Sequence, residues 1–377
     1  MAPFKSSLAR SVGKLLGVYK EGDLSLRGDL QSSRFTPDAA DPFTANIVMM
    51  GGGGGGGSYQ GGGGGGAGGM AIFTFAVTIG SPYPFQVGNS GAGSPSYPSD
   101  GSGGIYSYFN TDSGQKAGAG GGGGGDTAPP TPTTPGSALG GSGGGSGSLP
   151  NAANPGRAGV SASPDPLVFG GNSGGDSTSA GFPQGNTGGG GGGVGGNGLP
   201  GRQTSDPNGD GGGPGGAGKE APAPMFPSAF MKGSNFPSTF IGLPVSLPDA
   251  NLRTFGGGGG GGAEIGHPGE AYGGTGGGGN GANVNREDIS ATPGVHGRGA
   301  GGGGGGQVIG NPNVGKEGGG GVIYIQYPSL ATATIAVPSP RGPLSNTYTA
   351  NTGDSNTHYA IITADETGTT SGTITFN

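Results

Sequence analysis

The sequence predicts a mostly β protein with three parts. These are a short N-terminal amphipathic helix, a central slab of packed polyglycine-II-like helices flanked by short strands, and a small C-terminal antiparallel β module. Two observations carry this prediction. Glycine supplies 103 of the 377 residues, several times its usual share. In addition, long glycine runs of nearly equal length alternate with strand-like stretches. The expected domains are residues 1–42, 43–328 and 329–377.

The overall composition fits neither an ordinary globular domain nor an ordinary disordered chain. Hydrophobic residues make up 29% and charged residues 10%, so there is little apolar surface for one large core. Disorder normally combines low hydrophobicity with high net charge, which this chain lacks. Without cysteine, disulfides and thiolate metal sites are excluded. No stretch approaches the run of about 18 apolar residues that a membrane span requires.

The pattern of apolar residues in the N-terminal part predicts a short amphipathic helix over residues 5–19. Its apolar positions follow helical spacing and are Leu8, Val12, Leu15, Leu16 and Tyr19. Residues 1–35 contain six Lys/Arg against three Asp/Glu, a net charge of +3, whereas the remainder carries a net −9. We expect this basic head to dock on a protein, with a membrane surface as the less favoured alternative. Basic residues in the body are sparse, so no nucleic-acid partner is expected.

Strand-like stretches begin and end the glycine-rich region. Residues 46–50 lead into the first glycine run, residues 70–79 form a longer candidate rich in β-branched and aromatic side chains, and residues 322–327 follow the last glycines. After residue 328 the glycine runs stop. Thr there alternates with aliphatic residues in four short stretches, which predicts the C-terminal β module.

The glycine runs have matched lengths, which a flexible linker would not need because loop-closure entropy changes slowly with length. Uninterrupted runs of six or seven glycines occupy residues 51–57, 61–66, 120–125, 188–193, 256–262 and 301–306. In an extended threefold helix that rises about 3.1 Å per residue, six residues complete two turns. Each run would then cross a slab of the same thickness.

The physical argument for packing rests on the missing side chains. An extended left-handed helix makes no internal hydrogen bonds, so its backbone must bond to neighbouring helices or to water. Only glycine lacks the Cβ that would keep the axes apart. Flexible Gly-rich linker is the alternative. The glycines are contiguous and show no Gly-X-Y period, which excludes collagen.

The layout resembles the glycine-rich domain of bacteriophage tail-fibre and adhesin proteins. The stretches that carry the resemblance are IVMMGGGGGGGSYQGGGGGGAGG, FAVTIG, GGGGGGQVIG and GGGGVIYIQY, within residues 45–328. The opening SSLARSVGKLLGVYKEGDLSLRGDLQSSRF is similar to the start of virion structural proteins of marine and cyanobacterial phages. This chain departs from the family by its longer middle and its extra C-terminal module.

The resemblance implies a non-enzymatic virion protein, made in the host cytoplasm and acting outside the cell. A rigid polyglycine scaffold would present loops to a host-surface glycan or protein. The N-terminus would attach to other virion proteins, and copies would assemble with one another, for instance as a trimer. The alternative is a self-assembling architectural protein, either a filament subunit or a capsid decoration, with no receptor role.

Catalytic and metal motifs are weak throughout the chain, so neither an enzymatic activity nor a cofactor is expected. G-x-S-x-G occurs around Ser142 and Ser173, but no strand-to-helix turn is predicted there. The histidines His267, His296 and His358 lack ligand spacing. Asp206, Asn208 and Asp210 match the first half of a calcium loop, but Ala217 stands where the loop needs glutamate. A tight turn explains this motif equally well.

Aromatic residues between the glycine runs are the candidate binding residues. One set consists of Tyr83, Phe85, Tyr97, Tyr106, Tyr108 and Phe109, and a second of Phe226, Phe230, Phe236 and Phe240. Aromatics exposed on loops of a rigid scaffold commonly form binding surfaces. The alternative is that they supply the scarce core or a subunit interface, which we favour for the second set.

Overall fold

The computed structural model describes residues 42–96, 98–110, 115–124, 140–147, 168–179, 186–202, 211–222, 253–264, 271–283, 290–308, 311–337, 345–349, 357–364 and 368–377. Within these ranges the chain forms strands and extended segments without any helix, so the prediction of a mostly β protein is confirmed. The chain divides into two units at Asp41 and Pro42, and every described residue belongs to the second. The predicted N-terminal helix lies outside the described residues.

The strands belong to two larger sheets and three short two-stranded pairs. Their bounds are β1 Phe43–Met50, β2 Met70–Val77, β3 Pro82–Val87, β4 Ser107–Phe109, β5 Gln115–Ala117, β6 Val168–Phe169, β7 Thr178–Ser179, β8 Asn186–Thr187, β9 Lys219–Glu220, β10 Thr254–Phe255, β11 Gly306–Val308, β12 Asn311–Asn313, β13 Val322–Pro328, β14 Ala333–Ala336, β15 Ser345–Thr349, β16 Thr357–Thr363 and β17 Thr370–Phe376.

The first sheet has the order β15-β16-β13-β1-β2-β6, and the second has the order β14-β17-β3-β4-β5. All neighbouring strands are antiparallel. In the first sheet, Ile47 of β1 stands opposite Ile325 of β13 on one side and Phe73 of β2 on the other. The predicted strands at 46–50, 70–79 and 322–327 therefore form the centre of one sheet.

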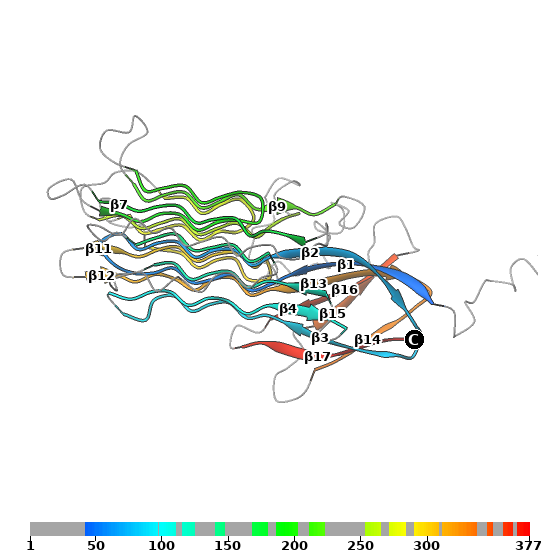
Figure 1. Ribbon diagram of the computed structural model, residues 1–377. Coiled ribbons are helices and arrows are strands. Elements are labelled where there is room, and N and C mark those ends of the chain that lie inside the picture. Colours follow the sequence, from blue (N-terminus) through cyan, green and yellow to red (C-terminus); the bar gives the residue numbers. More distant parts are fainter. Residues whose placement is uncertain are drawn as a thin grey trace, which may run out of the picture. The chain divides into compact units, whose positions relative to one another are not determined.

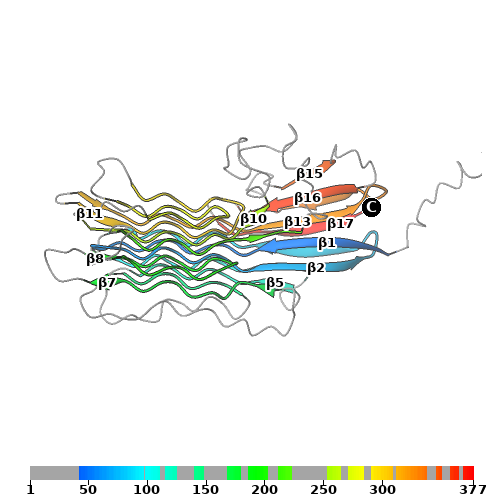
Figure 2. The same cartoon turned by 90° about the horizontal axis from the view of Figure 1, so that it is seen from above.

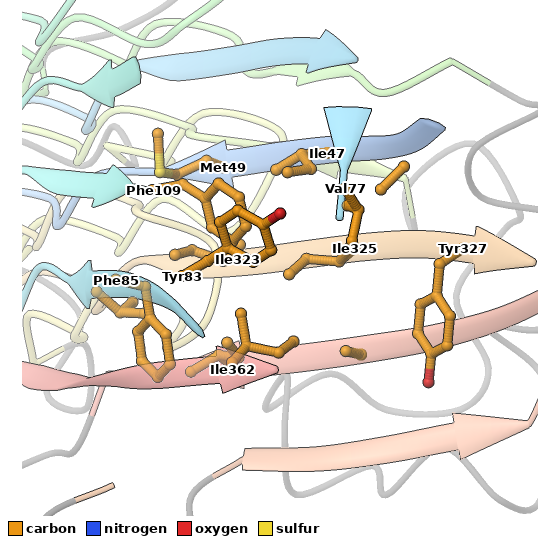
Figure 3. Close-up of a cluster of buried hydrophobic side chains, with 14 of the residues drawn as sticks. Ile47, Met49, Val77, Tyr83, Phe85, Phe109, Ile323, Ile325, Tyr327 and Ile362 are labelled. Atoms are coloured by element: carbon orange, nitrogen blue, oxygen red, sulfur yellow. The ribbon is translucent and has the colours of Figure 1, made fainter. Parts of the chain in front are cut away.

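The space between the two sheets holds the main hydrophobic core (Figure 3). The first sheet contributes residues such as Ile47, Met49 and Ile325, and the second contributes Phe85 and Phe109. This is the arrangement of a β-sandwich, in which inward side chains alternate with outward ones along each strand.

Tyr327 of β13 lies at one end of this core, edge-on to the ring of Phe376 with the ring centroids 5.2 Å apart. Burial raises the pKa of its hydroxyl to about 12, while a backbone hydrogen bond to Ala333 opposes part of that rise. A buried hydroxyl resists ionisation because the charged phenolate loses its hydration.

The opposite face of the first sheet is covered where it meets the glycine segments. Met50, Tyr324 and Ile361 pack there against Val194 and Phe255, which lie at the ends of glycine segments. Coverage on both faces explains why residues 47–50 of β1 and residues 322–325 of β13 form continuous apolar runs without alternation.

Arg298 is fully buried beside this second cluster. Its guanidinium lies 5.2 Å from the ring centroid of Phe255 and donates a hydrogen bond to the carbonyl of Thr254. Burial lowers the pKa of Arg298 to about 10, and the nearby Tyr324 partly offsets this. The planar, weakly hydrated guanidinium suits such a site, because it can stack on a ring while donating to a carbonyl.

The strands after residue 328 share sheets with strands that precede it. β16 pairs along its whole length with β13, and β17 joins β3 to β14. The described strands of residues 329–377 therefore belong to the two larger sheets, and strand pairing crosses the expected domain boundary at residue 328.

The glycine segments run side by side and continue from the ends of the strands (Figures 1 and 2). Segment 51–57 shows how they are joined. Amides three residues apart donate to the same neighbouring segment. The amides of Gly51, Gly54 and Gly57 donate to segment 61–69. Those of Gly52 and Gly55 donate to segment 99–105, and those of Gly53 and Gly56 to segment 313–321. The carbonyls of segment 51–57 accept from three further segments, through donors in 120–123, 91–94 and 302–305. These N···O distances are 2.7–3.0 Å.

The other long runs repeat this arrangement. The amides of segment 301–305 donate hydrogen bonds to carbonyls in segments 257–260 and 54–57 and to the carbonyl of Thr292. Its carbonyls accept hydrogen bonds from amides in segments 279–282 and 62–65 and from the amide of Lys316. A run that is bonded on all sides has no direction left for a side chain. A Cβ added to Gly54 would lie 2.0 Å from the carbonyl oxygen of Gly121, and one added to Gly301 would lie 1.9 Å from that of Gly65.

Outer segments have a different sequence pattern. In the stretch 291–297, Ala291, Gly294 and Gly297 are buried, while Thr292 and Pro293 are exposed. The stretch 198–201 likewise buries both glycines and exposes Leu199 and Pro200 between them. Short Gly-x-x repeats therefore do occur, contrary to the expectation of contiguous glycines only. In both stretches burial recurs at every third position, and the two residues before Gly294 and before Gly201 are exposed.

Positive φ values occur in turns and near the ends of the glycine segments. Among the described residues they occur at Gly80, Gly140, Gly170, Gly171, Gly256, Gly276, Gly277, Gly297 and Gly299, and at the single non-glycine Asn110. The interior glycines of the described runs are outside this region, which keeps each segment uniformly extended.

Candidate binding surface

Three of the predicted binding residues belong to the core. Phe85 is fully buried, Phe109 is 1% exposed and Tyr83 is 8% exposed. The Tyr83 and Phe109 rings stack with centroids 6.2 Å apart, and the Tyr83 hydroxyl accepts a hydrogen bond of 2.7 Å from the Thr78 amide. The prediction of a host-binding role for these three is corrected, because alternation along β3 and β4 turns them inward.

Tyr106 and Tyr108 lie on the outer face of the second sheet. Both are half-buried, and their ring centroids are 6.4 Å apart. The ammonium of Lys116 on β5 lies 4.9 Å from the Tyr106 ring centroid, and Lys116 stands directly opposite Tyr108 in the strand pairing. These three residues, together with Gln86, form what we call the tyrosine patch.

Strand register extends the tyrosine patch across the sheet. Gln86 stands opposite Tyr108 on one side and the exposed Ser371 on the other. The Gln86 side-chain amide donates to the Tyr106 carbonyl at 3.0 Å, which fixes its position. The described strand residues on this face are Pro82, Pro84, Gln86, Tyr108, Lys116, Thr334, Ala336, Ser371, Thr373 and Thr375, with Tyr106 just before β4. None of these residues carries a carboxylate.

A second surface lies on one flank of the glycine segments. Leu199 is 50% exposed and Tyr272 is 59% exposed. They are linked through the backbone between them, because the Leu199 amide donates to the Pro214 carbonyl and the Gly215 amide donates to the Tyr272 carbonyl, each at 2.9 Å. We call Leu199, Pro200, Pro214 and Tyr272 the apolar flank.

Side chains also fasten segment ends far from the two sheets. The Asn186 amide group donates to Gln60 at 2.6 Å and to the Glu264 carboxylate at 3.2 Å, and its backbone amide reaches the same carboxylate at 3.1 Å. Three segments distant in sequence are therefore tied together where they enter their connecting loops.

Several sequence predictions fall outside the described residues. They are Tyr97, the attachment-helix residues Leu8, Val12, Leu15, Leu16 and Tyr19, the calcium candidates Asp206, Asn208 and Asp210, the Phe226–Phe240 aromatic set, and His267. Within the described ranges, no three His, Asp or Glu side chains gather in a way that could hold a metal ion.

The two G-x-S-x-G serines lie in laterally bonded segments. Ser142 is fully buried, and its hydroxyl donates to the Gly193 carbonyl at 3.1 Å. The Ser173 amide donates to the Asn197 side chain at 3.0 Å. His296 bridges Gly320 and Ala364 through its two ring nitrogens, at 3.3 and 2.7 Å, and His358 packs edge-on to Tyr327. Both described histidines thus take part in packing.

Comparison with known proteins finds no significant match. No family model matches the chain, and no curated protein or solved structure is significantly similar to it. In the part of the chain that the structure describes, no helix has the length and apolar character needed to cross a bilayer.

Sequence reasoning missed Lys116 as a member of the tyrosine patch. The stretch GQKAG carries no aromatic residue and borders a glycine run, so nothing in it suggested a strand. The alternation PYPFQV over β3 was a usable signal, because it predicts that Gln86 faces opposite to Phe85.

Proposed function

We propose that the glycine segments are polyglycine-II-like helices packed in a lattice. Three features support this proposal. The donors of segment 51–57 rotate through three neighbours with a period of three residues, which matches the three residues per turn of this helix. The run also accepts from three other segments, as a central helix in a hexagonal array would. Finally, an added Cβ would overlap a neighbouring backbone.

Within this lattice, hydrogen bonds replace side-chain packing as the main lateral contact. Each such bond contributes about 0.5–1.5 kcal/mol net, and ordering a glycine costs about 0.5–1 kcal/mol more than ordering an alanine. The balance is close for an isolated bundle. The adjoining sandwich, with its two apolar clusters, would supply the remaining stability by anchoring the segment ends.

We propose that the chain is a non-enzymatic phage virion protein, a tail-fibre or adhesin subunit. The observation that carries this is the layout in which β1 leads into segment 51–57 and segment 313–321 leads back into β13, the neighbour of β1. A stiff bundle fixed to a sandwich in this way would hold its connecting loops at a set position for contact with a host surface. Residues 1–42 would join it to other virion proteins.

The apolar flank supports self-assembly in either of two roles. Two exposed large apolar side chains on one flank of a glycine-rich bundle favour association between copies, for instance as a trimer in a fibre. The same contact could propagate into a filament or decorate a capsid with no receptor role. This architectural function is the second candidate.

Immunogold labelling tests the proposal. Antibodies raised against the purified chain would be applied to particles released from cells that produce it. Gold on particle tails is the expected result. Gold on tail-less filaments, or uniform fibres formed by the purified chain alone, would favour the architectural function. Absence of the chain from purified particles by mass spectrometry would overturn both virion roles.

A further inference from the structure

We propose that two Asn-Gly steps in the outer glycine segments, Asn197-Gly198 and Asn280-Gly281, are sites of spontaneous deamidation that the packed segments hold in an unreactive state. Both asparagines are exposed. The inference rests on the proposed polyglycine lattice and is independent of the virion role. A further Asn-Gly step, Asn208-Gly209, lies outside the described residues.

The first step is clamped to a single residue of the neighbouring segment. The Ser173 amide donates to Asn197 Oδ1 at 3.0 Å, and the Gly198 amide donates to the Ser173 carbonyl at 2.9 Å. Ser173 therefore bonds both the side chain that would react and the backbone nitrogen that would attack it.

The second step repeats this arrangement. The Gly273 amide donates to Asn280 Oδ1 at 2.9 Å, and the Gly281 amide donates to the Ala271 carbonyl at 2.9 Å. Thr292 adds two bonds from another segment: its hydroxyl accepts from the Asn280 backbone amide at 2.7 Å, and its own amide donates to the Asn280 carbonyl at 2.9 Å. Asn280 is thus held by two neighbours.

Deamidation at such a step needs no reagent except water. The backbone nitrogen of the glycine attacks the asparagine Cγ, forms a new C–N bond and loses its proton, while the side-chain nitrogen leaves as ammonia. Water then opens the resulting succinimide ring at either carbonyl, which gives aspartate or isoaspartate. Glycine favours the attack because it has no Cβ to obstruct the ring closure.

The packed segments oppose this reaction. The asparagine side chain must turn toward the nitrogen of the following glycine, and that nitrogen must give up its hydrogen bond. Because both groups are bonded to a neighbouring segment, the reaction has to wait until the outer segment detaches. The rate of deamidation should then follow the fraction of time for which that segment is open.

The isoaspartate product would disturb the lattice itself. In isoaspartate the main chain runs through the former side chain and gains a methylene group. That extra atom would shift the three-residue repeat in which the Gly198 amide bonds Ser173 and the Gly201 amide bonds Asp176. Each conversion would therefore loosen an outer segment irreversibly.

The test follows deamidation of the full chain by mass spectrometry at mildly alkaline pH, with and without guanidinium chloride. Trypsin places the two steps in separate peptides, residues 158–202 and 254–286, and fragmentation locates the converted residue. We expect both steps to react at least about tenfold more slowly in the folded chain than in the denatured chain.

A matched pair of variants isolates the clamp. Thr292→Val removes the hydroxyl that accepts from Asn280, so it should speed deamidation of the folded chain at Asn280 about threefold to tenfold. Asn197 should keep its wild-type rate. Thr275 is a similarly exposed threonine outside the clamp, and Thr275→Val should change either rate less than about twofold.

Equal rates in the folded and denatured chain would overturn the proposal, as would a Thr292→Val variant that folds and leaves the Asn280 rate unchanged. If Thr292→Val does not fold, the comparison of folded and denatured wild-type chain decides. Glycine amide exchange separates this failure from failure of the lattice. Equal deamidation rates with slow exchange would remove only the protected sites, whereas equal rates with fast exchange would remove the lattice as well.

Discussion

Gly54 and Gly196 show how differently two glycines of the same bundle are placed. A Cβ at Gly54 would lie 2.0 Å from the Gly121 carbonyl oxygen, whereas the nearest atom to a Cβ at Gly196 is the Ala217 amide nitrogen at 3.8 Å. We expect Gly54→Ala to destabilise the fold by about 2–4 kcal/mol because two backbones must separate. Gly196→Ala should be neutral or stabilising by about 0.4–1 kcal/mol. Chemical denaturation measures both, and equal effects would contradict the close-packing argument.

Ser107 joins the sandwich to the first glycine run. Its buried hydroxyl donates to the Met50 carbonyl at 2.6 Å and accepts from the Gly88 amide at 2.9 Å. We expect Ser107→Ala to cost about 1–3 kcal/mol, since two buried backbone groups lose a partner. Ser102 makes a similar pair of bonds to Ala92 in an exposed position. Ser102→Ala should therefore cost less than about 0.5 kcal/mol, and a larger loss there than at Ser107 would refute this assignment.

The raised pKa of Tyr327 predicts that the stability of the fold depends on pH, and it fixes the sign of that dependence. Between about pH 10 and pH 12 the unfolded chain loses this phenolic proton while the folded chain keeps it. The folded state then binds more protons, so stability falls as the pH rises through this window. Tyr327→Phe should flatten the decline in unfolding midpoint over that range. Tyr272→Phe, at an exposed position, serves as the control and should keep the wild-type slope.

At the scale of elements, the C-terminal strands are structural partners of the first half of the chain. Ending the chain at residue 328 would remove β16 from beside β13 and β17 from beside β3. It would also remove Ile362, Ile374 and Phe376 from the core. We expect the shortened chain to aggregate, because it would expose apolar surface and strand edges. A soluble chain ending at residue 328 with an intact melting transition would show that residues 329–377 are separable.

The sequence was informative about strands and much less so about how they pair. Strands β1, β2 and β13 could be predicted because each contains a run of apolar residues. Burial on both faces or a high content of β-branched and aromatic residues accounts for these runs. The pairing of β17 with β3 could not, since it joins residues about 290 positions apart in sequence and no local pattern records it. The prediction of binding residues was wrong in part for a related reason. Phe85 and Tyr108 cannot be distinguished in the sequence as isolated aromatic residues, and only the strand register decides which of them faces outward.

At the scale of the whole molecule, the central question is whether bonded glycine backbone behaves as a solid core. The described runs contain amides such as those of Gly55, Gly63 and Gly191, each bonded to a neighbouring segment at 2.8–2.9 Å and buried. Their hydrogens can exchange with solvent only when segments separate. Because each described run is hydrogen-bonded to several neighbouring segments, separating one run would require several of these contacts to open together.

Selective ¹⁵N-glycine labelling makes this measurable, since glycine amides can then be followed alone by NMR after transfer to heavy water. We expect a large class of glycine signals to persist with protection factors of at least about 10³, alongside a fast class from loops. Gly54→Ala should reduce protection across neighbouring runs, whereas Gly196→Ala should leave it unchanged. If all glycine amides instead exchanged at the rate of an unstructured peptide, the lattice would not exist in solution. The proposed stiff scaffold would then have no physical basis, even if the sandwich remained folded.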